Sequence, residues 1–302
     1  MFLPTTLEYF HNIIFSILCC IPFIYFIIGH IFHTYPNILH KKKQLGHLKK
    51  CQLIAHRGSR LEGLPENSIA AFKDASKYAD ILELDVWLTK DNEIIIHHDD
   101  TYKRMTNGYV TKPMNDLYYD ETPDLYHKIP NQCNRINEYK NNDCLKIPTF
   151  EQVLQLIQDT DTHLIIEFKQ DSELLISLVH TLLIKYNRIK VLDTTTDTST
   201  TDTSITNNNI NHNNINIDMK YCKDYWFSLV EKINVKLYKH DPNIPRITSV
   251  IGMLKIYMYY FCGILPYISI TENAFGCTLE MVSCIVVVVV VVGVVVVVVV
   301  VV

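Results

Sequence analysis

Short runs of apolar, often β-branched residues recur along the first half of the chain, and polar residues follow each run closely. Three such runs, at 53–55, 81–82 and 94–96, lead into His56, Glu83 and His97. Short apolar runs bounded by turn residues are typical of buried strands. Polar groups at the ends of several buried strands are what a (β/α) barrel presents at its catalytic face. The pattern therefore predicts an α/β chain whose polar side chains converge on one mouth.

The spacing of apolar residues also predicts the elements between these motifs. We expect strands at 52–58, 81–88, 93–98 and 163–169. Helices are predicted over 68–78, 150–159 and 174–186, the first capped by Asn67 or Ser68. Residues 109–148 are polar, aromatic and irregular, which is typical of a loop-rich rim over a site.

Three carboxylates in this pattern indicate a metal site. Glu83 and Asp85 are two residues apart on one predicted strand, so their side chains lie on the same face. Two like charges that close repel each other unless a cation or protons intervene. Glu167 adds a third carboxylate at the end of another apolar run. A hard divalent ion such as Mg²⁺ or Ca²⁺ takes carboxylate oxygens, so we predict that these three residues hold one.

Basic and imidazole groups next to the carboxylates indicate chemistry on a phosphate. Arg57 and Lys169 supply positive charge for a phosphate, and His56 and His98 supply groups that exchange protons near neutral pH. Other interpretations stay open. A histidine at a strand end is more often a structural group, His97 competes with His98, and a Glu–Lys pair such as that of Lys169 often forms a simple surface ion pair.

Four motifs in order carry a family resemblance: His-Arg-Gly at 56–58, Glu-Asn at 66–67, Glu-x-Asp at 83–85 and His-Asp-x-Thr-x-x-Arg-x-Thr-x-Gly at 98–108. The ordered set resembles the glycerophosphodiester phosphodiesterase family. That resemblance implies a TIM-type barrel of the phospholipase C-like phosphodiesterase kind, with a further strand near 189–192. It implies the following roles: His56 and His98 as general acid and base, Glu83, Asp85 and Glu167 as metal ligands, Arg57 and Lys169 as phosphate contacts, and Glu66 and Asn67 in a supporting turn.

The N-terminal region predicts a membrane anchor. Residues 13–32 carry no charge and are about long enough to cross a bilayer. The first twelve residues contain no Lys or Arg, so they lack the positive region of a cleaved signal peptide. Five lysines follow within 41–50, and the positive-inside rule then keeps the catalytic part in the cytoplasm. We predict a signal anchor at 1–33, a basic linker at 34–51 and a single-pass protein of the endoplasmic reticulum or another internal membrane.

The anchor, the segment 35–40 and a late apolar stretch at 247–270 together resemble the membrane-anchored subgroup of the family. That resemblance implies a lysophospholipase D, which acts on lysophospholipids to leave lysophosphatidic acid, and also on glycerophosphodiesters. We expect contacts with membrane lipids, and 253–270 reads as an interfacial helix, a hydrophobic lip or ordinary barrel packing. The formal net charge of −4 excludes a polybasic nucleic-acid binder. Nine cysteines without a Cys-x-x-Cys pair indicate reduced thiols.

Two tracts depart from the family pattern. Residues 193–218 are almost only Thr, Asn, Asp, Ser and Ile, a composition typical of a disordered insertion, and 286–302 are all Val except Gly293. We therefore expect the barrel at 52–284 to be incomplete at its C-terminal end, with a poly-Val tail at 285–302. The alternative function is a truncated, catalytically inactive lipid-binding membrane protein. A phosphoinositide-specific phospholipase C shares the two histidines but not the Glu-Asn and Glu-x-Asp motifs.

Overall fold

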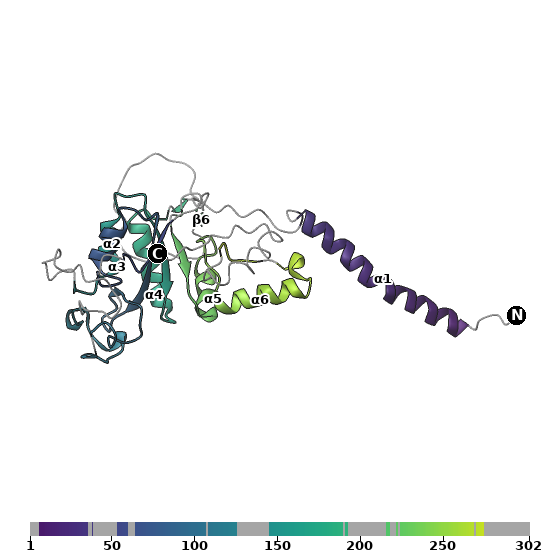
Figure 1. The fold of residues 1–302 in the computed structure, drawn as a ribbon, viewed down its shortest axis with the longest axis horizontal. Coiled ribbons are helices and arrows are strands. Elements are labelled where there is room, and N and C mark those ends of the chain that lie inside the picture. The colour runs from purple at the N-terminus through teal and green to yellow at the C-terminus, as the bar shows by residue number, and fades with distance from the viewer. Residues whose placement is uncertain are drawn as a thin grey trace.

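The computed structural model describes residues 6–35, 38, 53–59, 64–106, 108–125, 145–189, 191–192, 216–217, 222, 224–268 and 270–274. Most of the predicted basic linker, most of the Thr/Asn tract and the poly-Val tail lie outside these residues. Figure 1 shows an α/β body from which one long helix, α1 (Thr6–Thr34), projects. Within α1, Ile13–Phe32 is long and apolar enough to cross a membrane, and none of it is buried.

A mainly parallel sheet forms the centre of the body. Its parallel strands lie in the order β1 (Ile54–His56), β2 (Ile81–Leu88), β4 (His163–Phe168) and β7 (Tyr225–Phe227). Single parallel bridges from Trp226 to Arg246 and from Ile247 to Ala274 extend this arc. The strands of the described residues therefore form part of a barrel that remains open. The α/β barrel class predicted from the sequence is confirmed.

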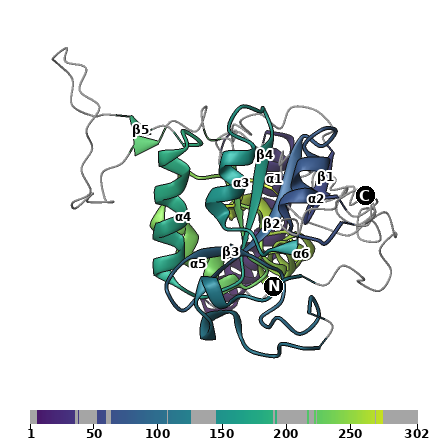
Figure 2. The same ribbon diagram turned by 90° about the vertical axis from the view of Figure 1, so that its left-hand side faces the viewer.

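Alternation along the strands separates two layers of side chains. Leu82, Leu84 and Val86 of β2 point outward into the main hydrophobic core. Helices cover that outer side in Figure 2: α2 (Ile69–Ala75), α3 (Phe150–Leu156), α4 (Glu173–Lys185) and α5 (Glu231–His240). The alternate residues of β2 face the barrel interior. Of these, Ile81 belongs to a second apolar cluster, to which each parallel strand of the arc and the bridge between Ile247 and Ala274 contribute residues. The members of that cluster are Ile54, Ile81, Ile165, Tyr225, Ile247 and Ala274.

The caps of the helices follow the sequence closely. Ser68, rather than Asn67, caps α2, because its hydroxyl accepts a hydrogen bond from the Ala71 amide at 3.1 Å. Thr149 caps α3 in the same way through the Gln152 amide. Asn67 is left to make a different contact, described below. The predicted helices at 68–78, 150–159 and 174–186 all form; α2 and α3 lie within their expected ranges, and α4 begins one residue earlier than expected.

The strand expected near 189–192 does not enter the central sheet. β5 (Val191–Leu192) instead pairs antiparallel with β6 (Asn216–Ile217) in a separate ribbon, and β6 lies at the end of the tract predicted to be disordered. β7 takes the place beside β4. The reason is packing: Trp226 is fully buried against Phe168, with ring centroids 5.5 Å apart, and the Ser228 hydroxyl donates to the Phe168 carbonyl at 2.8 Å. A two-residue strand offers no comparable buried surface.

The rim and the late apolar stretch complete the body. In its described part the rim carries the short 3₁₀ helices η2 (Met114–Asp116) and η3 (Tyr119–Glu121), packed over a small apolar cluster of their own. The late apolar stretch forms α6 (Val250–Phe261) and η8 (Leu265–Tyr267).

Gly58 lies in the turn after β1, in close contact with the backbone of α2. It has a φ of +82°, and a Cβ there would lie 2.9 Å from the backbone carbon of Ala71. Gly108 has a similar φ of +86° but open space around it. We expect Gly108→Ala to lower the free energy of unfolding by about 1 kcal/mol through backbone strain alone. Gly58→Ala adds an overpacking cost of roughly 1–3 kcal/mol. Urea unfolding of both variants measures the difference, and equal losses would contradict the close contact with α2.

Candidate active site

The two carboxylates of the Glu-x-Asp motif lie in the middle of β2, inside the strand predicted at 81–88. β3 (Ile94–Ile96) then runs antiparallel to β2. This return places the His97 amide against the Asp85 carbonyl, with a hydrogen bond of 3.0 Å. The chain therefore carries His97 and His98 back to the level of the carboxylates.

Glu83, Asp85 and Glu167 form one buried acidic cluster. Asp85 lies directly beside Glu167 in the pairing of β2 with β4, and ligand oxygens of all three residues lie within 4.8 Å of one another. Their exposed fractions are 7%, 0% and 6%. Burial, and then the charges of Asp85 and Glu167, raise the pKa of Glu83 well above its ordinary value. Such a cluster requires positive charge to remain ionised.

Side chains of the protein supply part of that charge. The Lys169 ammonium lies 2.8 Å from a Glu167 oxygen and 3.1 Å from Asp85 Oδ1. Burial lowers the pKa of Lys169, but Asp85 and Glu167 outweigh burial and raise it. Asn67 Nδ2 donates to Asp85 Oδ2 at 2.8 Å. The acidic cluster is thus already paired with the ammonium group of Lys169, and one oxygen from each of its three carboxylates suits a divalent metal ion.

Arg57 is held by an unusual backbone turn. It has a φ of +59°, and Gly58 and Asn67 also have positive φ values. The Arg57 amide donates to Glu83 Oε2 at 3.0 Å, and its carbonyl accepts from the Asn67 amide at 2.8 Å. Its guanidinium bonds Glu66 at 3.0 Å and lies 3.6 Å from Asp85 Oδ2. A left-handed non-glycine residue is strained, and this turn uses it to aim both the amide and the guanidinium at the cluster.

The two predicted catalytic histidines both lie at this site. His56 Nε2 is 3.8 Å from Glu83 Oε2. His98 Nδ1 is 2.8 Å from Asp99 Oδ1, and His98 lines a pocket of about 740 Å³ together with Lys169 and Arg104. A carboxylate on Nδ1 fixes the imidazole so that Nε2 is the nitrogen left for a reacting group.

His97, the competing candidate, has a different environment. It is only 2% exposed, and its Nε2 lies 3.3 Å from the Thr101 carbonyl. Burial lowers its pKa to about 4. A neutral, enclosed imidazole is a structural group, so the geometry favours His98 as the histidine that faces the pocket.

Asp99 and Arg104 also belong to the site, although the sequence analysis gave neither of them a role of its own. Arg104 bonds Asp99 through Nε at 2.6 Å and Glu66 through its terminal nitrogen at 2.5 Å. Glu66 in turn bonds Arg57, so a chain of ion pairs joins Arg57 to His98 by way of Glu66, Arg104 and Asp99. The motif at 98–108 contains both residues, but only the fold brings Glu66 and Arg104, 38 positions apart, into contact.

Comparison with known proteins places this geometry in a family. The profile of the glycerophosphoryl diester phosphodiesterase family matches residues 56–217, more than half of the chain. This chain belongs to that family. It is accordingly a phosphoric diester hydrolase by membership, and the matched range contains every residue of the site described above.

Individual relatives agree with the family. The chain is 29% identical over 252 residues to lysophospholipase D GDPD1 of Homo sapiens, covering 83% of this chain and 68% of that protein. It is 40% identical over 121 residues to a glycerophosphodiester phosphodiesterase of Caldanaerobacter subterraneus, covering 40% of this chain and 46% of that protein. A solved glycerophosphoryl diester phosphodiesterase structure from Silicibacter pomeroyi, described as putative, shares the fold with a TM-score of 0.51 at 15% identity, covering 83% of each chain.

The ion-pair chain makes a prediction about acid stability. Burial opposes ionisation of Glu66, but hydrogen bonds and charges from Arg104 and Arg57 lower its pKa to about 2. A carboxyl whose pKa is lower in the folded state stabilises the fold above its unfolded pKa, near 4.5, and loses this effect as pH falls towards 2. Glu66→Gln should therefore lower the free energy of unfolding by roughly 2–3 kcal/mol at pH 6.

Urea unfolding at pH 6 and pH 3 measures this effect, and the gap between wild type and Glu66→Gln should narrow at the lower pH. Glu173→Gln is the matched control, because the Glu173 side chain is 80% exposed and pairs with Lys236 at a distance of 3.5 Å. A gap that stays equal at both pH values would show that the charge of Glu66 is not what stabilises the turn.

Proposed function

We propose that this chain hydrolyses the head-group phosphodiester of lysophospholipids to leave lysophosphatidic acid, and that it also accepts glycerophosphodiesters. One observation carries the proposal: His56, Arg57 and Lys169 lie within 4 Å of a buried acidic cluster, and Lys169 also lines a pocket with His98, on a chain that has a membrane-length apolar helix. The human relative named lysophospholipase D supports the lysophospholipid class, and the bacterial relative supports glycerophosphodiesters.

We infer that Glu83, Asp85 and Glu167 hold a divalent cation, Mg²⁺ or Ca²⁺. Their close, buried oxygens and the raised pKa of Glu83 fit such an ion, because a cation relieves the repulsion between the carboxylates. When bound, the cation supplies positive charge that stabilises the phosphate oxygens in the transition state.

The remaining steps fall to side chains of the chain itself. Arg57 and Lys169 hold the phosphate, since both already point at the acidic cluster. One of His56 and His98 takes a proton from the attacking oxygen, which is a water or a neighbouring substrate hydroxyl. The other gives a proton to the departing alcohol. Glu66 and Asn67 support this arrangement by fixing Arg57 and Asp85.

For the cellular setting, we propose that α1 anchors the chain and that the catalytic body faces the cytoplasm at the endoplasmic reticulum or another internal membrane. The apolar helix supports the anchor, and the lysines at 41–50 support the orientation.

Removing either imidazole tests the proton-transfer roles. His56→Ala and His98→Ala should each lower kcat about 10²–10⁴-fold, the usual contribution of a positioned acid or base. His163→Ala is the matched control, because His163 begins β4 at the opposite end of the strand from Glu167. The assay is choline release from lysophosphatidylcholine and from glycerophosphocholine. Full activity in either site variant would reject the assignment.

Metal binding is tested separately by calorimetry. The chelated protein should be inactive and recover with Mg²⁺ or Ca²⁺, and Asp85→Asn should weaken binding of that ion at least about 10-fold. Asp74→Asn, at an exposed ion pair with Lys77, should bind it like the wild type. Turnover that survives complete chelation would remove the cation from the mechanism.

A second candidate function is an inactive lipid-binding membrane protein. The open arc formed by the strands of the described residues favours it. Binding of lysophosphatidylcholine to the purified chain, with no choline release at any divalent cation, would select this candidate over the hydrolase.

A further inference from the structure

A stripe of large apolar side chains covers the outer face of α6. Ile251, Leu254, Met258 and Phe261 are 50%, 56%, 64% and 82% exposed. Their spacing of three, four and three residues puts them on one face of the helix. The opposite face is buried through Gly252, Met253 and Ile256. We call Val250, Ile251, Leu254, Met258 and Phe261 the α6 stripe.

The stripe carries no charged side chain of its own. Lys255 is the only charged residue of α6, and it lies at the edge of the stripe. Its ammonium is already bonded to Glu231 of α5 at 2.6 Å. A half-exposed helix whose outward face is wholly apolar is costly in water, so a covering surface of low polarity is required.

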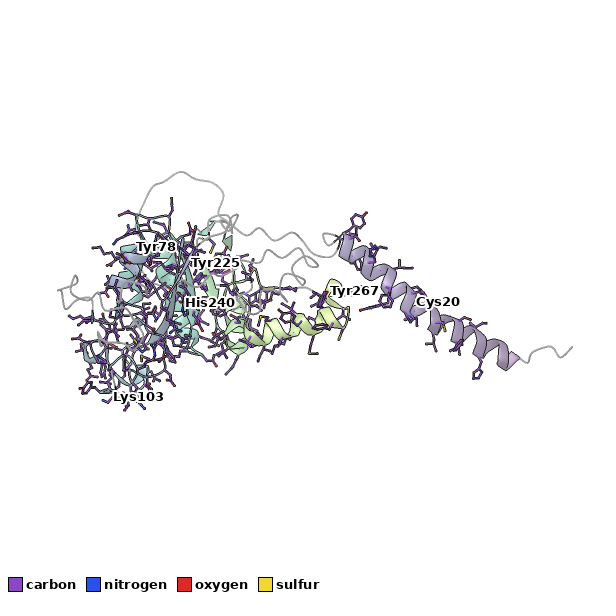
Figure 3. All side chains as sticks on the ribbon, in the orientation of Figure 1. Cys20, Tyr78, Lys103, Tyr225, His240 and Tyr267 are labelled. Carbon is purple, nitrogen blue, oxygen red and sulfur yellow. The ribbon has the colours of Figure 1, made fainter. Side chains whose placement is uncertain are left out.

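The adjoining 3₁₀ helix is in direct contact with the membrane-length helix. Tyr267 stacks on Tyr25 with ring centroids 5.8 Å apart and meets Phe32 edge-on at 5.4 Å. In Figure 3, Tyr267 lies between the end of α6 and α1. Gly263 permits this approach, because a Cβ there would lie 3.0 Å from the Tyr25 hydroxyl. Among the side chains of Ile13–Phe32, only Tyr25, Gly29 and Phe32 are partly covered, and they form one stripe of their own.

These contacts set the depth of α6 relative to the span. Tyr25 lies seven residues before Phe32, which is about 10 Å of helix out of a hydrocarbon core of roughly 30 Å. Tyr267 is therefore placed in the outer third of that core, at the end where the span leaves it. The Tyr25 hydroxyl also donates to the Cys262 carbonyl at 3.1 Å, so this helix-end carbonyl has the protein partner that a bilayer core, which excludes water, would demand.

We propose that the α6 stripe and η8 form a membrane-docking surface, seated in the headgroup and outer acyl region of the same phospholipid bilayer that α1 crosses. The bilayer is chosen as the covering surface because η8, which follows α6, contacts α1 directly through Tyr267. α6 also leaves the sheet just after Arg246 and Ile247, whose parallel bridges place them on the barrel arc, so it starts from the edge at which parallel strands end.

Depth-resolved fluorescence quenching of the full chain tests this. Leu254→Trp and Met258→Trp each add one indole to the stripe. Trp87 and Trp226 fluoresce in every variant, so the fluorescence of the wild type is subtracted as background. The chain is reconstituted into phosphatidylcholine bilayers whose acyl chains carry bromine near the headgroup end. An interfacial helix buries its apolar face roughly 5–10 Å, so we expect the added fluorescence to fall by about half.

Tyr78→Trp is the matched control. Tyr78 is 47% exposed, similar to the stripe residues, and Figure 3 places it on the side of the body away from α1. Its added fluorescence should be unchanged by brominated lipid. Equal quenching at all three positions, or none at the two stripe positions, would overturn the proposal. So would unquenched stripe positions in a chain that sediments as a dimer, since a second copy would then cover the stripe.

A second measurement links docking to turnover and rests on the proposed function. Leu254→Glu combined with Met258→Glu should reduce hydrolysis of lysophosphatidylcholine in bilayers about 10-fold while leaving water-soluble glycerophosphocholine unaffected. If the chain hydrolyses neither substrate, the proposed function fails and the quenching result still decides the docking surface. If quenching is absent while both substrates turn over, only the docking surface fails.

Discussion

The repulsion among three buried carboxylates governs the architecture of this site. Glu83, Asp85 and Glu167 are so close together and so deeply buried that they cannot all be ionised without compensating positive charge. The surrounding structure can be understood as a response to that constraint. Lys169 lies against Asp85 and Glu167, the Arg57 amide donates to Glu83, and the Asn67 side-chain amide donates to Asp85. A strained turn is kept because it delivers Arg57 to this place.

The strand alternation of β2 makes the buried charge compatible with a stable fold. Its even-numbered residues bury themselves under α2, α3 and α4, so the strand is anchored by ordinary apolar packing on its outer side. Its odd-numbered residues pass from Ile81 to Glu83 and Asp85 along the barrel interior. The apolar layer of Ile54, Ile81 and Ile165 lies one layer below the charges in the barrel interior, and Lys169 at the cluster also lines the pocket. Neighbouring residues of β2 therefore point in turn to the hydrophobic core and to the barrel interior that holds the charges.

The sequence predicted those parts of the structure that depend on local pattern. The bounds of β2, a cap of α2 at Asn67 or Ser68 and the convergence of the acidic residues follow from alternation, capping chemistry and the ordered motifs. Two features could not be predicted that way. The choice of β7 over 189–192 depends on Trp226 filling space against Phe168. The contact of Arg104 with Glu66 is equally non-local, since it forms only when both loops close over the sheet.

The site is also more self-contained than the barrel around it. Its acidic, basic and imidazole groups come from β1, β2, β4, the return through β3 and the turns that follow them. β7 and the bridge at Ile247 contribute to the layer below through Tyr225 and Ile247. The later part of the described chain, α6 and η8, meets α1 and contributes no ligand to the cluster. The acidic, basic and imidazole groups are therefore supplied by the first strands of the arc and the turns after them, whereas the last described elements pack against α1.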